Sequence, residues 1–239
     1  MNIALFGYGK MGHQIESVAK ERGHKIIVYF DSEADWQMKG HELSKCDVAI
    51  DFSTPETAIS NIQRCFAAKI PIVSGTTGWH SQLAAIRSEC LATGNTLFFA
   101  SNFSLGVNLF FELNRHLAKI MNKHSEYSAS IEEIHHIHKL DSPSGTAITL
   151  ANDIINGLDR LAAWKNTTRH ADNELPIRSI RQDEVSGTHT ISYDSEADSI
   201  EIKHIAKNRH GFAIGAMLAA EFIQGKSGFF GMNDMLAMG

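Results

Sequence analysis

The stretch Asn2-Ile-Ala-Leu-Phe-Gly-Tyr-Gly-Lys-Met-Gly12 decides the fold of this chain. Its apolar half, Asn2–Phe6, predicts a short buried strand, and the pattern Gly-x-Gly-x-x-Gly opens a helix predicted over Gly12–Arg22. The first glycine permits a tight turn, the second lets the backbone approach a pyrophosphate, and the third allows the helix to pack closely on the strand. The sequence therefore predicts a dinucleotide-binding loop. The residues expected to contact the cofactor here are Gly7, Tyr8, Gly9, Lys10, Met11 and Gly12.

An acidic residue follows the second predicted strand, Lys25–Phe30. At this place in a dinucleotide-binding fold, Asp31 would accept hydrogen bonds from the ribose hydroxyls of the adenosine half. Glu33 adds a second negative charge, so the 2′-phosphate of NADPH would be repelled. We therefore expect NADH to be the preferred cofactor, with some use of NADPH retained through Lys10. The alternative is a turn that binds no phosphate, with Asp31 as a solvated strand end.

Short apolar strands alternate with helices through the first hundred residues. The predicted elements are strand Asp47–Phe52, a helix from Pro55 to Ala68 capped by Thr54, strand Ile70–Ser74, helix Trp79–Ala92 and strand Thr96–Ala100. This alternation predicts an α/β fold with a Rossmann-type, doubly wound parallel sheet. Small polar residues follow two of the strands, where ligands bind in such sheets, although they also suit ordinary turns. The residues expected to contact the cofactor in these two segments are Gly75, Thr76, Thr77, Ser101, Asn102, Phe103 and Ser104.

The pattern changes after Ser104. A long helix is predicted over Leu105–Lys123, and a buried final helix over Gly211–Gln224. Segments with period-two alternation predict an open mixed or antiparallel sheet; these are Tyr127–Ile134, Ile177–Arg181, Thr188–Tyr193 and Ser199–Ile205. The polar segment Ala163–Glu174 shows no periodicity and predicts a mobile loop.

Three imidazoles and an ammonium group lie within the five residues from His135 to Lys139. Ser144-Gly145-Thr146 follows, ahead of a helical pattern, and a helix start offers unpaired N–H groups to an anion. Proton donors beside an anion site favour a small acidic substrate that gains or loses a proton. The alternative is a His-rich surface loop.

Two further inferences concern the same segment. In an extended chain His135 and Lys139 share a face while His136 points to the other, so we expect the strand to end near His135. The neighbouring Glu132 and Glu133 are expected on a solvated strand edge. Clustered histidines can also bind zinc, but HExxH and cysteine pairs are lacking and Lys139 would repel a cation, so no metal is expected.

Composition excludes several classes of protein. The net charge of −5 and an isoelectric point near 6.2 argue against a nucleic-acid partner. Three widely spaced cysteines without a CxxC pair indicate reduced thiols in a cytoplasmic protein. No signal peptide precedes the first strand, and the apolar stretch Phe212–Ala220 is too short to cross a bilayer, so no membrane partner is expected.

The segment His135-His-Ile-His-Lys-Leu-Asp-Ser-Pro-Ser-Gly-Thr-Ala147 resembles the signature of the 4-hydroxy-tetrahydrodipicolinate reductase (dihydrodipicolinate reductase) family of lysine and diaminopimelate synthesis. Gly75-Thr-Thr-Gly78 and the Asn-Phe-Ser of residues 102–104 also match family features that contact the nicotinamide half of the cofactor. One departure is Ser142, where the family usually has Ala. The matches run in order along the whole chain.

The resemblance implies an NAD(P)H-dependent oxidoreductase acting on a small dicarboxylate. It implies proton transfer by His135 and Lys139, with substrate bound by His136 and by Gly145 and Thr146 at the helix start, where Ser144 is the adjoining candidate. It further implies a dinucleotide-binding domain of residues 1–103 and 209–239 and an inserted α+β domain of residues 104–208, which binds substrate and forms a homotetramer. Two alternatives from the residues are another Rossmann-domain amino-acid dehydrogenase and a non-catalytic dinucleotide sensor.

Overall fold

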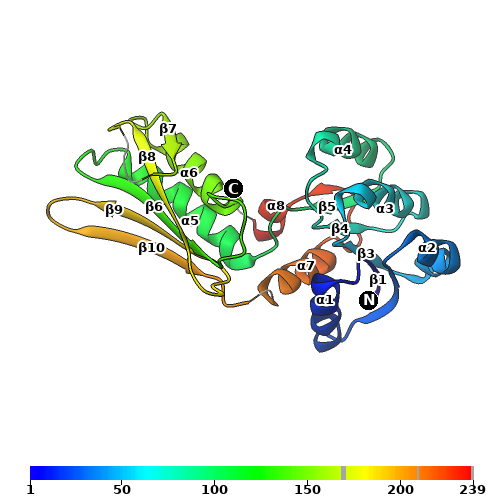
Figure 1. Ribbon diagram of the computed structural model, residues 1–239. Helices are drawn as coiled ribbons and strands as arrows, with labels where there is room; N and C mark the ends of the chain where they lie inside the picture. Colours follow the sequence, from blue (N-terminus) through cyan, green and yellow to red (C-terminus); the bar gives the residue numbers. More distant parts are fainter. Residues whose placement is uncertain (168–170, 209, 238–239) are drawn as a thin grey trace. The chain divides into compact units, whose positions relative to one another are not determined.

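The chain divides into two compact units, each with its own sheet and core (Figure 1). The computed structural model describes residues 1–167, 171–208 and 210–237. Unit 1 comprises Met1–Leu105 together with Arg209–Gly239, and unit 2 comprises Gly106–Asn208. Unit 1 is therefore built from both ends of the chain. Among the described residues, no helix is both long enough and apolar enough to span a membrane.

Unit 1 contains a six-stranded sheet in the order β11-β5-β4-β3-β1-β2, in which every neighbouring pair is parallel. This confirms the predicted Rossmann-type sheet. Strand β11 was not predicted; it is short and pairs with β5 at the edge of the sheet. The strands are β1 (Asn2–Phe6), β2 (Lys25–Phe30), β3 (Val48–Asp51), β4 (Ile72–Ser74), β5 (Thr96–Phe99) and β11 (Gly228–Phe230).

Helices of unit 1 lie between these parallel strands in the chain, except that α7 follows unit 2 and α8 follows the last strand. They are α1 (Lys10–Glu21), α2 (Glu33–Lys39), α3 (Pro55–Ala68), α4 (Leu83–Ala92), α7 (His210–Phe222) and α8 (Met232–Leu236), with 3₁₀ turns η1 (Gly40–Lys45) and η2 (His80–Gln82). Thr54 and Thr57 form a reciprocal cap with Pro55 in the first turn, which explains where α3 begins. The helix predicted from Trp79 begins instead as η2, because the buried Trp79 indole donates to the Thr76 carbonyl.

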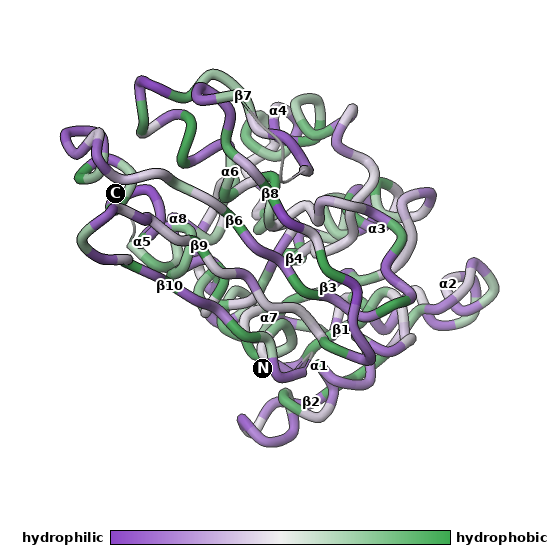
Figure 2. The backbone as a smooth tube through the Cα atoms, turned by 60° about the vertical axis from the view of Figure 1, so that its left-hand side comes forward, coloured by the Kyte–Doolittle hydropathy of each residue, from purple (hydrophilic) through white to green (hydrophobic). Residues whose placement is uncertain are grey.

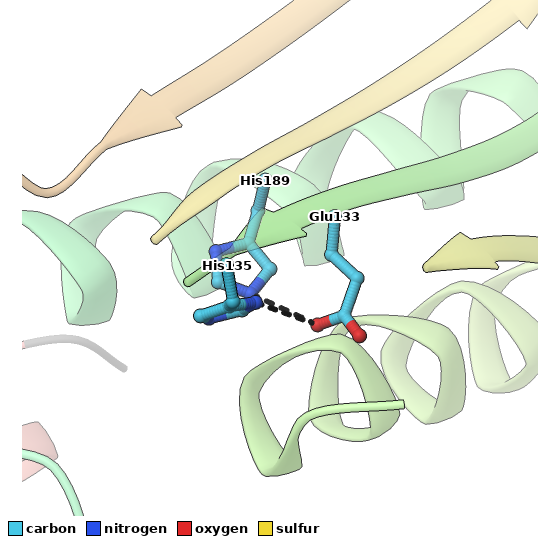
Figure 3. Close-up of side chains that lie close together, drawn as sticks. All are labelled: Glu133, His135 and His189. Carbon is cyan, nitrogen blue, oxygen red and sulfur yellow. Dashed lines mark ion pairs between the residues drawn. The ribbon is translucent and has the colours of Figure 1, made fainter. Parts of the chain in front are cut away.

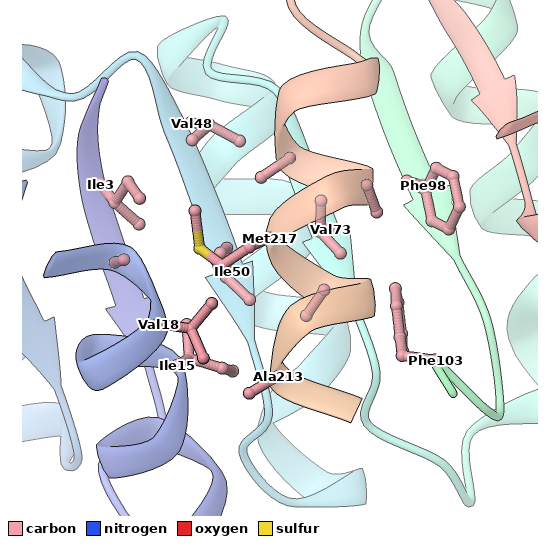
Figure 4. Packing of buried hydrophobic residues seen from close by; sticks show 14 of the residues in the cluster. Ile3, Ile15, Val18, Val48, Ile50, Val73, Phe98, Phe103, Ala213 and Met217 are labelled. Carbon is pink, nitrogen blue, oxygen red and sulfur yellow. The ribbon is translucent and has the colours of Figure 1, made fainter. Parts of the chain in front are cut away.

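Apolar residues cover both faces of this sheet. Ile3 and Leu5 pack on one face with α1 and α7, while Ala4 and Phe6 pack on the other with α3 and α4. Figure 4 shows the first of these cores, in which Met217 of α7 lies over the central strands. Near-continuous apolar strands of this kind are expected where helices bury both faces of a parallel sheet.

Unit 2 contains a mixed sheet in the order β10-β9-β6-β8-β7. β6 pairs antiparallel with β9 and parallel with β8, which confirms the predicted open mixed sheet. The elements are α5 (Leu105–Met121), β6 (Ser128–His135), α6 (Gly145–Gly157), β7 (Ala163–Lys165), β8 (Glu174–Arg181), β9 (Thr188–Asp194) and β10 (Ser199–Ile205).

One face of this second sheet packs on the two helices. Ile131, Ile177 and Ile191 contribute to a core with Leu150 and Ile154 of α6. The neighbours of these isoleucines along the strands are polar, apart from Pro176. Hydrophilic and hydrophobic residues accordingly alternate along the backbone of the strands (Figure 2).

The prediction of a mobile loop over Ala163–Glu174 was wrong at both ends. Ala163–Lys165 forms β7, which pairs with the first residues of β8, and Trp164 packs against the core. The Lys165 ammonium lies 2.9 Å from the Glu174 carboxylate. A three-residue strand is too short to show periodicity, which explains the error. Residues 168–170 of the expected loop lie outside the described residues.

Close packing between α7 and the segment after β5 leads to a first prediction. A Cβ at Gly215 would lie 1.8 Å from the Phe103 carbonyl oxygen, so Gly215→Ala must push the helix or that segment aside. We expect a loss of about 1–3 kcal/mol in the free energy of unfolding, measured by urea denaturation. Gly211 lies in the same helix with open space around it, so Gly211→Ala is the control and should not destabilise. Equal effects of the two changes would contradict the packing argument.

Candidate active site

The His-rich segment begins where β6 ends. The strand stops at His135, as predicted, and the chain then turns, with the Lys139 N–H donating to the His136 carbonyl at 3.1 Å. His138 is exposed and lies 3.4 Å from Glu184. The Lys139 ammonium lies 2.8 Å from the Asp141 carboxylate. The turn thus places the imidazoles of the run in different surroundings, because His135 is buried and His138 is not.

Glu133 is fully buried, which corrects the prediction of a solvated strand edge. Both of its carboxylate oxygens accept the Ser144 N–H, at 3.0 and 3.1 Å, and Oε1 also accepts the Ser179 hydroxyl at 2.8 Å. Nδ1 of His135 lies 3.3 Å from Oε2. Burial opposes ionisation of this carboxyl, but the contacts with His135, Ser144 and Ser179 hold its pKa well below the usual range.

His189 of β9 completes a cluster with Glu133 and His135 (Figure 3). Its Nε2 lies 3.7 Å from the carboxylate, and its ring lies edge-on to that of His135 with 5.1 Å between centroids. Burial, together with the charges of the neighbouring groups, lowers the pKa of His189 to about 4, so this imidazole is neutral at pH 7. His189 was not predicted as a site residue, because it lies 54 residues from His135 and only strand pairing brings the two together.

These three residues also have metal-ligand chemistry. The nitrogen and oxygen atoms they offer lie within 4.8 Å of one another. The carboxylate, however, already accepts hydrogen bonds from Ser144 and Ser179, and the Arg181 guanidinium lies 3.7 Å from it. A divalent cation would have to displace these donors and tolerate a like charge, so the residues present do not favour a metal.

The start of α6 lies directly beside this cluster. Ser144 is the N-cap and is buried; its hydroxyl accepts the Ala147 N–H at 3.2 Å and lies 3.2 Å from His189 Nε2. Gly145 and Thr146 are the first two residues of the helix, where N–H groups have no acceptor within the helix. A Cβ at Gly145 would meet open space. The helix start can therefore receive an anion at Gly145 and Thr146, while the polar groups of Ser144 are already engaged.

Arg181 is a further residue of the site that spacing alone did not single out. Its guanidinium donates to the carbonyls of Lys139 and Asp141, at 3.3 and 2.6 Å. It therefore holds the turn after His135 in place while adding positive charge beside Glu133. Of the basic residues that follow in the chain, Lys203 lies on β10 and Lys207 is exposed, whereas Arg209 lies outside the described residues.

In unit 1 the glycine-rich loop has the geometry of a phosphate cradle. Gly7 has a φ of +85°, and a Cβ there would lie 2.3 Å from the Phe52 carbonyl oxygen. A Cβ at Gly12 would lie 2.5 Å from the Gly7 oxygen, whereas one at Gly9 would meet no atom within 4 Å. Only glycine suits the first and third positions, and the open second position leaves backbone accessible at the start of α1. The loop therefore fits a pyrophosphate.

The side chains around this loop are ordered by Asp31. Its Oδ1 accepts the Tyr8 N–H at 2.9 Å, which ties the loop to the end of β2. The Tyr8 ring stacks on that of Tyr29 with 4.1 Å between centroids. Lys10 is exposed at the start of α1, and Met11 lines a pocket. The residues lining that pocket are Met11, Phe52, Ser53, Pro55, Gly75, Thr76 and Thr77.

The buried carboxyl group of Asp51 holds residues of this pocket in place through hydrogen bonds. It accepts hydrogen bonds from the hydroxyls of Ser74 and Thr76, at 3.0 and 2.7 Å, and from Ser53 and Asn61. Burial raises the pKa of Asp51, although these donors oppose the rise. The Thr76 hydroxyl also accepts the Ser53 N–H at 2.9 Å, so the segments after β3 and β4 are joined.

The segment after β5, residues 101–104, has few side chains that could contact a cofactor. The Phe103 side chain is buried in the core against Phe52 and Phe98. The Asn102 Oδ1 accepts the Ser104 N–H at 2.9 Å, which closes a turn. Ser104 is buried and Ser101 is exposed. A side-chain contact with cofactor is therefore open to Ser101 and not to Phe103.

The lowered pKa of Glu133 leads to a second prediction. A carboxylate whose folded-state pKa lies below its unfolded value stabilises the fold above about pH 4.5, and this stabilisation is lost as the pH falls. Glu133→Gln should cost about 1–3 kcal/mol in the free energy of unfolding at pH 7.5. The gap from the unsubstituted protein should narrow at pH 3, which lies below the unfolded pKa of about 4.5 and toward the lowered folded-state pKa. Urea denaturation at the two pH values measures this, and a gap independent of pH would contradict the assignment.

The comparisons with known proteins agree along the whole chain. A family model described as "Dihydrodipicolinate reductase, N-terminus" matches residues 1–103, and one described as "Dihydrodipicolinate reductase, C-terminus" matches residues 106–236. The chain is 50% identical over 239 residues to the 4-hydroxy-tetrahydrodipicolinate reductase of Christiangramia forsetii, covering 99% of this chain and 98% of that protein. It is 35% identical over 204 residues to the one from Neisseria gonorrhoeae, covering 82% and 74%.

Solved structures with this fold include the dipicolinate-bound dihydrodipicolinate reductase of Paenisporosarcina sp. TG-14. It is 20% identical with a TM-score of 0.79 over 98% of each chain. A probable dehydrogenase from Thermotoga maritima is 11% identical with a TM-score of 0.54 over 98% of this chain and 92% of that one. At these identities the structural similarity concerns the fold alone.

Proposed function

The chain belongs to the dihydrodipicolinate reductase family, and we propose how its own residues reduce 4-hydroxy-tetrahydrodipicolinate to tetrahydrodipicolinate with NAD(P)H. The enzyme is an oxidoreductase of lysine and diaminopimelate synthesis. The product lacks the substrate's hydroxyl, so the reaction takes up a hydride and a proton and releases water. One observation carries the proposal for the site: Glu133 contacts both the proton-donor candidate His135 and the helix start at Ser144.

Unit 1 is proposed to hold the cofactor. Gly9 and its neighbours in the loop would receive the pyrophosphate, and Asp31 would accept from the ribose, since one of its oxygens already orders the loop. When bound, NAD(P)H supplies the hydride. The pocket between Met11 and Thr77 is the proposed place for the nicotinamide half.

Unit 2 is proposed to bind substrate and supply the proton. Gly145 and Thr146 would hold one carboxylate at the start of α6, and Lys139 would pair with the other after releasing Asp141. His135 would donate the proton, and His136 would add a contact to substrate. Ser144, whose groups are engaged, is proposed to position the helix start.

The quaternary and cellular settings are proposals as well. The polar face of the sheet in unit 2 is the face that no helix covers within the described chain, and we propose that it serves assembly into a homotetramer. All three cysteines are buried and free, which suits a reducing cytoplasm.

The direct test is oxidation of NADH with freshly made product of dihydrodipicolinate synthase as substrate. Turnover that needs both reactants supports the proposal. An amino-acid dehydrogenase would instead turn over amino acids, and a dinucleotide sensor would bind NADH without turnover with any substrate. Either of these results would overturn it.

The role of His135 leads to a third prediction. His135→Gln should lower kcat by roughly 10²–10⁴-fold, the usual contribution of a positioned general acid. NADH affinity should stay near that of the unsubstituted enzyme, because the glycine-rich loop belongs to unit 1. His138→Gln is the matched control, since this imidazole is exposed. Unchanged turnover in His135→Gln would refute the assignment.

Cofactor preference gives a fourth prediction. Arg64 of α3 donates to both carboxylate oxygens of Glu33, at 2.8 and 2.6 Å, and lies over the Trp36 ring. This cation was not predicted to lie near Glu33, because it belongs to another helix. Arg64 is already paired with Glu33, and Asp31 is a second acidic residue nearby in sequence that would repel a 2′-phosphate. We therefore propose that NADH is preferred over NADPH. A tenfold preference needs only about 1.4 kcal/mol.

Glu33→Gln should release Arg64 and remove one repelling charge. We expect kcat/KM for NADPH to rise roughly tenfold while that for NADH is nearly unchanged. Quenching of tryptophan fluorescence during cofactor titration measures the affinities independently of turnover. Glu42→Gln breaks a comparable surface pair with Lys45 and serves as the control. A preference for NADPH in the unsubstituted enzyme would contradict the proposal.

A further inference from the structure

Glu133 contacts both parts of the proposed substrate site in unit 2, namely His135 and the start of α6. The same carboxylate that accepts the Ser144 N–H lies 3.3 Å from Nδ1 of His135. A buried carboxylate is costly unless donors surround it, and this one has several. Its ionised state is therefore maintained next to an imidazole that is itself only 7% exposed.

The two nitrogens of His135 lie in different surroundings. Nδ1 faces the Glu133 carboxylate, whereas Nε2 lies next to Gly187, where an added Cβ would come within 3.1 Å. The absence of a side chain at Gly187 therefore leaves room at Nε2. The His135 carbonyl also accepts the Gln182 N–H at 2.8 Å, so the backbone beneath the ring is held.

We propose that Glu133 is a positioning residue for the reduction: its carboxylate accepts the Nδ1 proton of His135, stabilises the imidazolium and directs the Nε2 proton toward the substrate. Through the Ser144 N–H, the same carboxylate fixes the imidazole relative to the helix start that binds the substrate carboxylate. This inference rests on the proposed function of His135. It adds a residue that touches neither substrate nor cofactor.

Other charged groups surround this pair, and their contributions have known signs. Arg181 from β8 and Lys139 from the following turn disfavour an imidazolium, and Asp141 favours it. His189 from β9 and His204 from β10 are both held neutral by burial. With two cations close by, Glu133 is a buried anion in contact with His135, so its removal takes away a charge that favours a protonated ring.

The test compares Glu133→Gln with Glu126→Gln in steady-state kinetics over pH 5–9. Glu126 is an exposed carboxylate of unit 2 that lies 3.3 Å from His124, so it controls for loss of a carboxylate paired with an imidazole. In Glu133→Gln we expect kcat to fall roughly 10–10³-fold. The alkaline limb of the kcat profile should move about one pH unit or more to lower pH. Glu126→Gln should change neither.

Two results would overturn the inference. One is a Glu133→Gln enzyme that loses activity with an unchanged pH profile, which indicates a structural role alone. The other is a His135 Nδ1 without a proton in the folded, unsubstituted protein. ¹⁵N spectra of the histidines measure this, and the His135 signal is identified by its absence in His135→Gln. That measurement decides the matter even if Glu133→Gln does not fold. Failure of the proposed function appears separately, as lack of turnover in the unsubstituted enzyme.

Discussion

A carboxylate withdrawn from water must be surrounded by donors, and both units of this chain are organised around such a group. In unit 1, Asp51 at the end of β3 gathers hydroxyls from the segments after β3 and β4. In unit 2, Glu133 near the end of β6 gathers the start of α6 and the end of β8. In each case the requirement for hydrogen bonds brings together loops that are distant in sequence, and the candidate sites lie on those loops.

These two buried carboxyl groups restrain their surroundings because most of their acceptor sites are occupied by hydrogen bonds. The two carboxyl oxygens of Asp51 accept hydrogen bonds from four side chains among the described residues. Each partner is thereby restrained without a covalent link. The first turn of α6 is capped in the same way, because Ser144 uses its N–H toward Glu133 and its hydroxyl toward Ala147. Preorganisation of this kind lowers the cost of arranging a site when substrate binds.

Much of the fold follows from local pattern. Apolar strands such as β1, the proline at the start of α3 and the glycine-rich loop each have a local physical cause, and all appear where the sequence predicts them. Short elements such as β7 and β11 contain too few residues for periodicity. Contacts between residues distant in sequence could not be predicted either. Glu133 was expected at a solvated strand edge, because its burial depends on which face of the sheet α6 covers. His189 and Arg64 lie far along the chain from the residues that they contact.

The composition of unit 1 from both ends of the chain has a consequence for biosynthesis. Its core includes Ala213, Met217 and Ile223, which a ribosome adds only after all of unit 2 has been made. Until then the face of the sheet beside α1 lacks its covering helix and remains apolar and wet. The first unit to be translated is thus the last whose core can close, and the nascent protein must keep that surface from aggregating while the rest is synthesised.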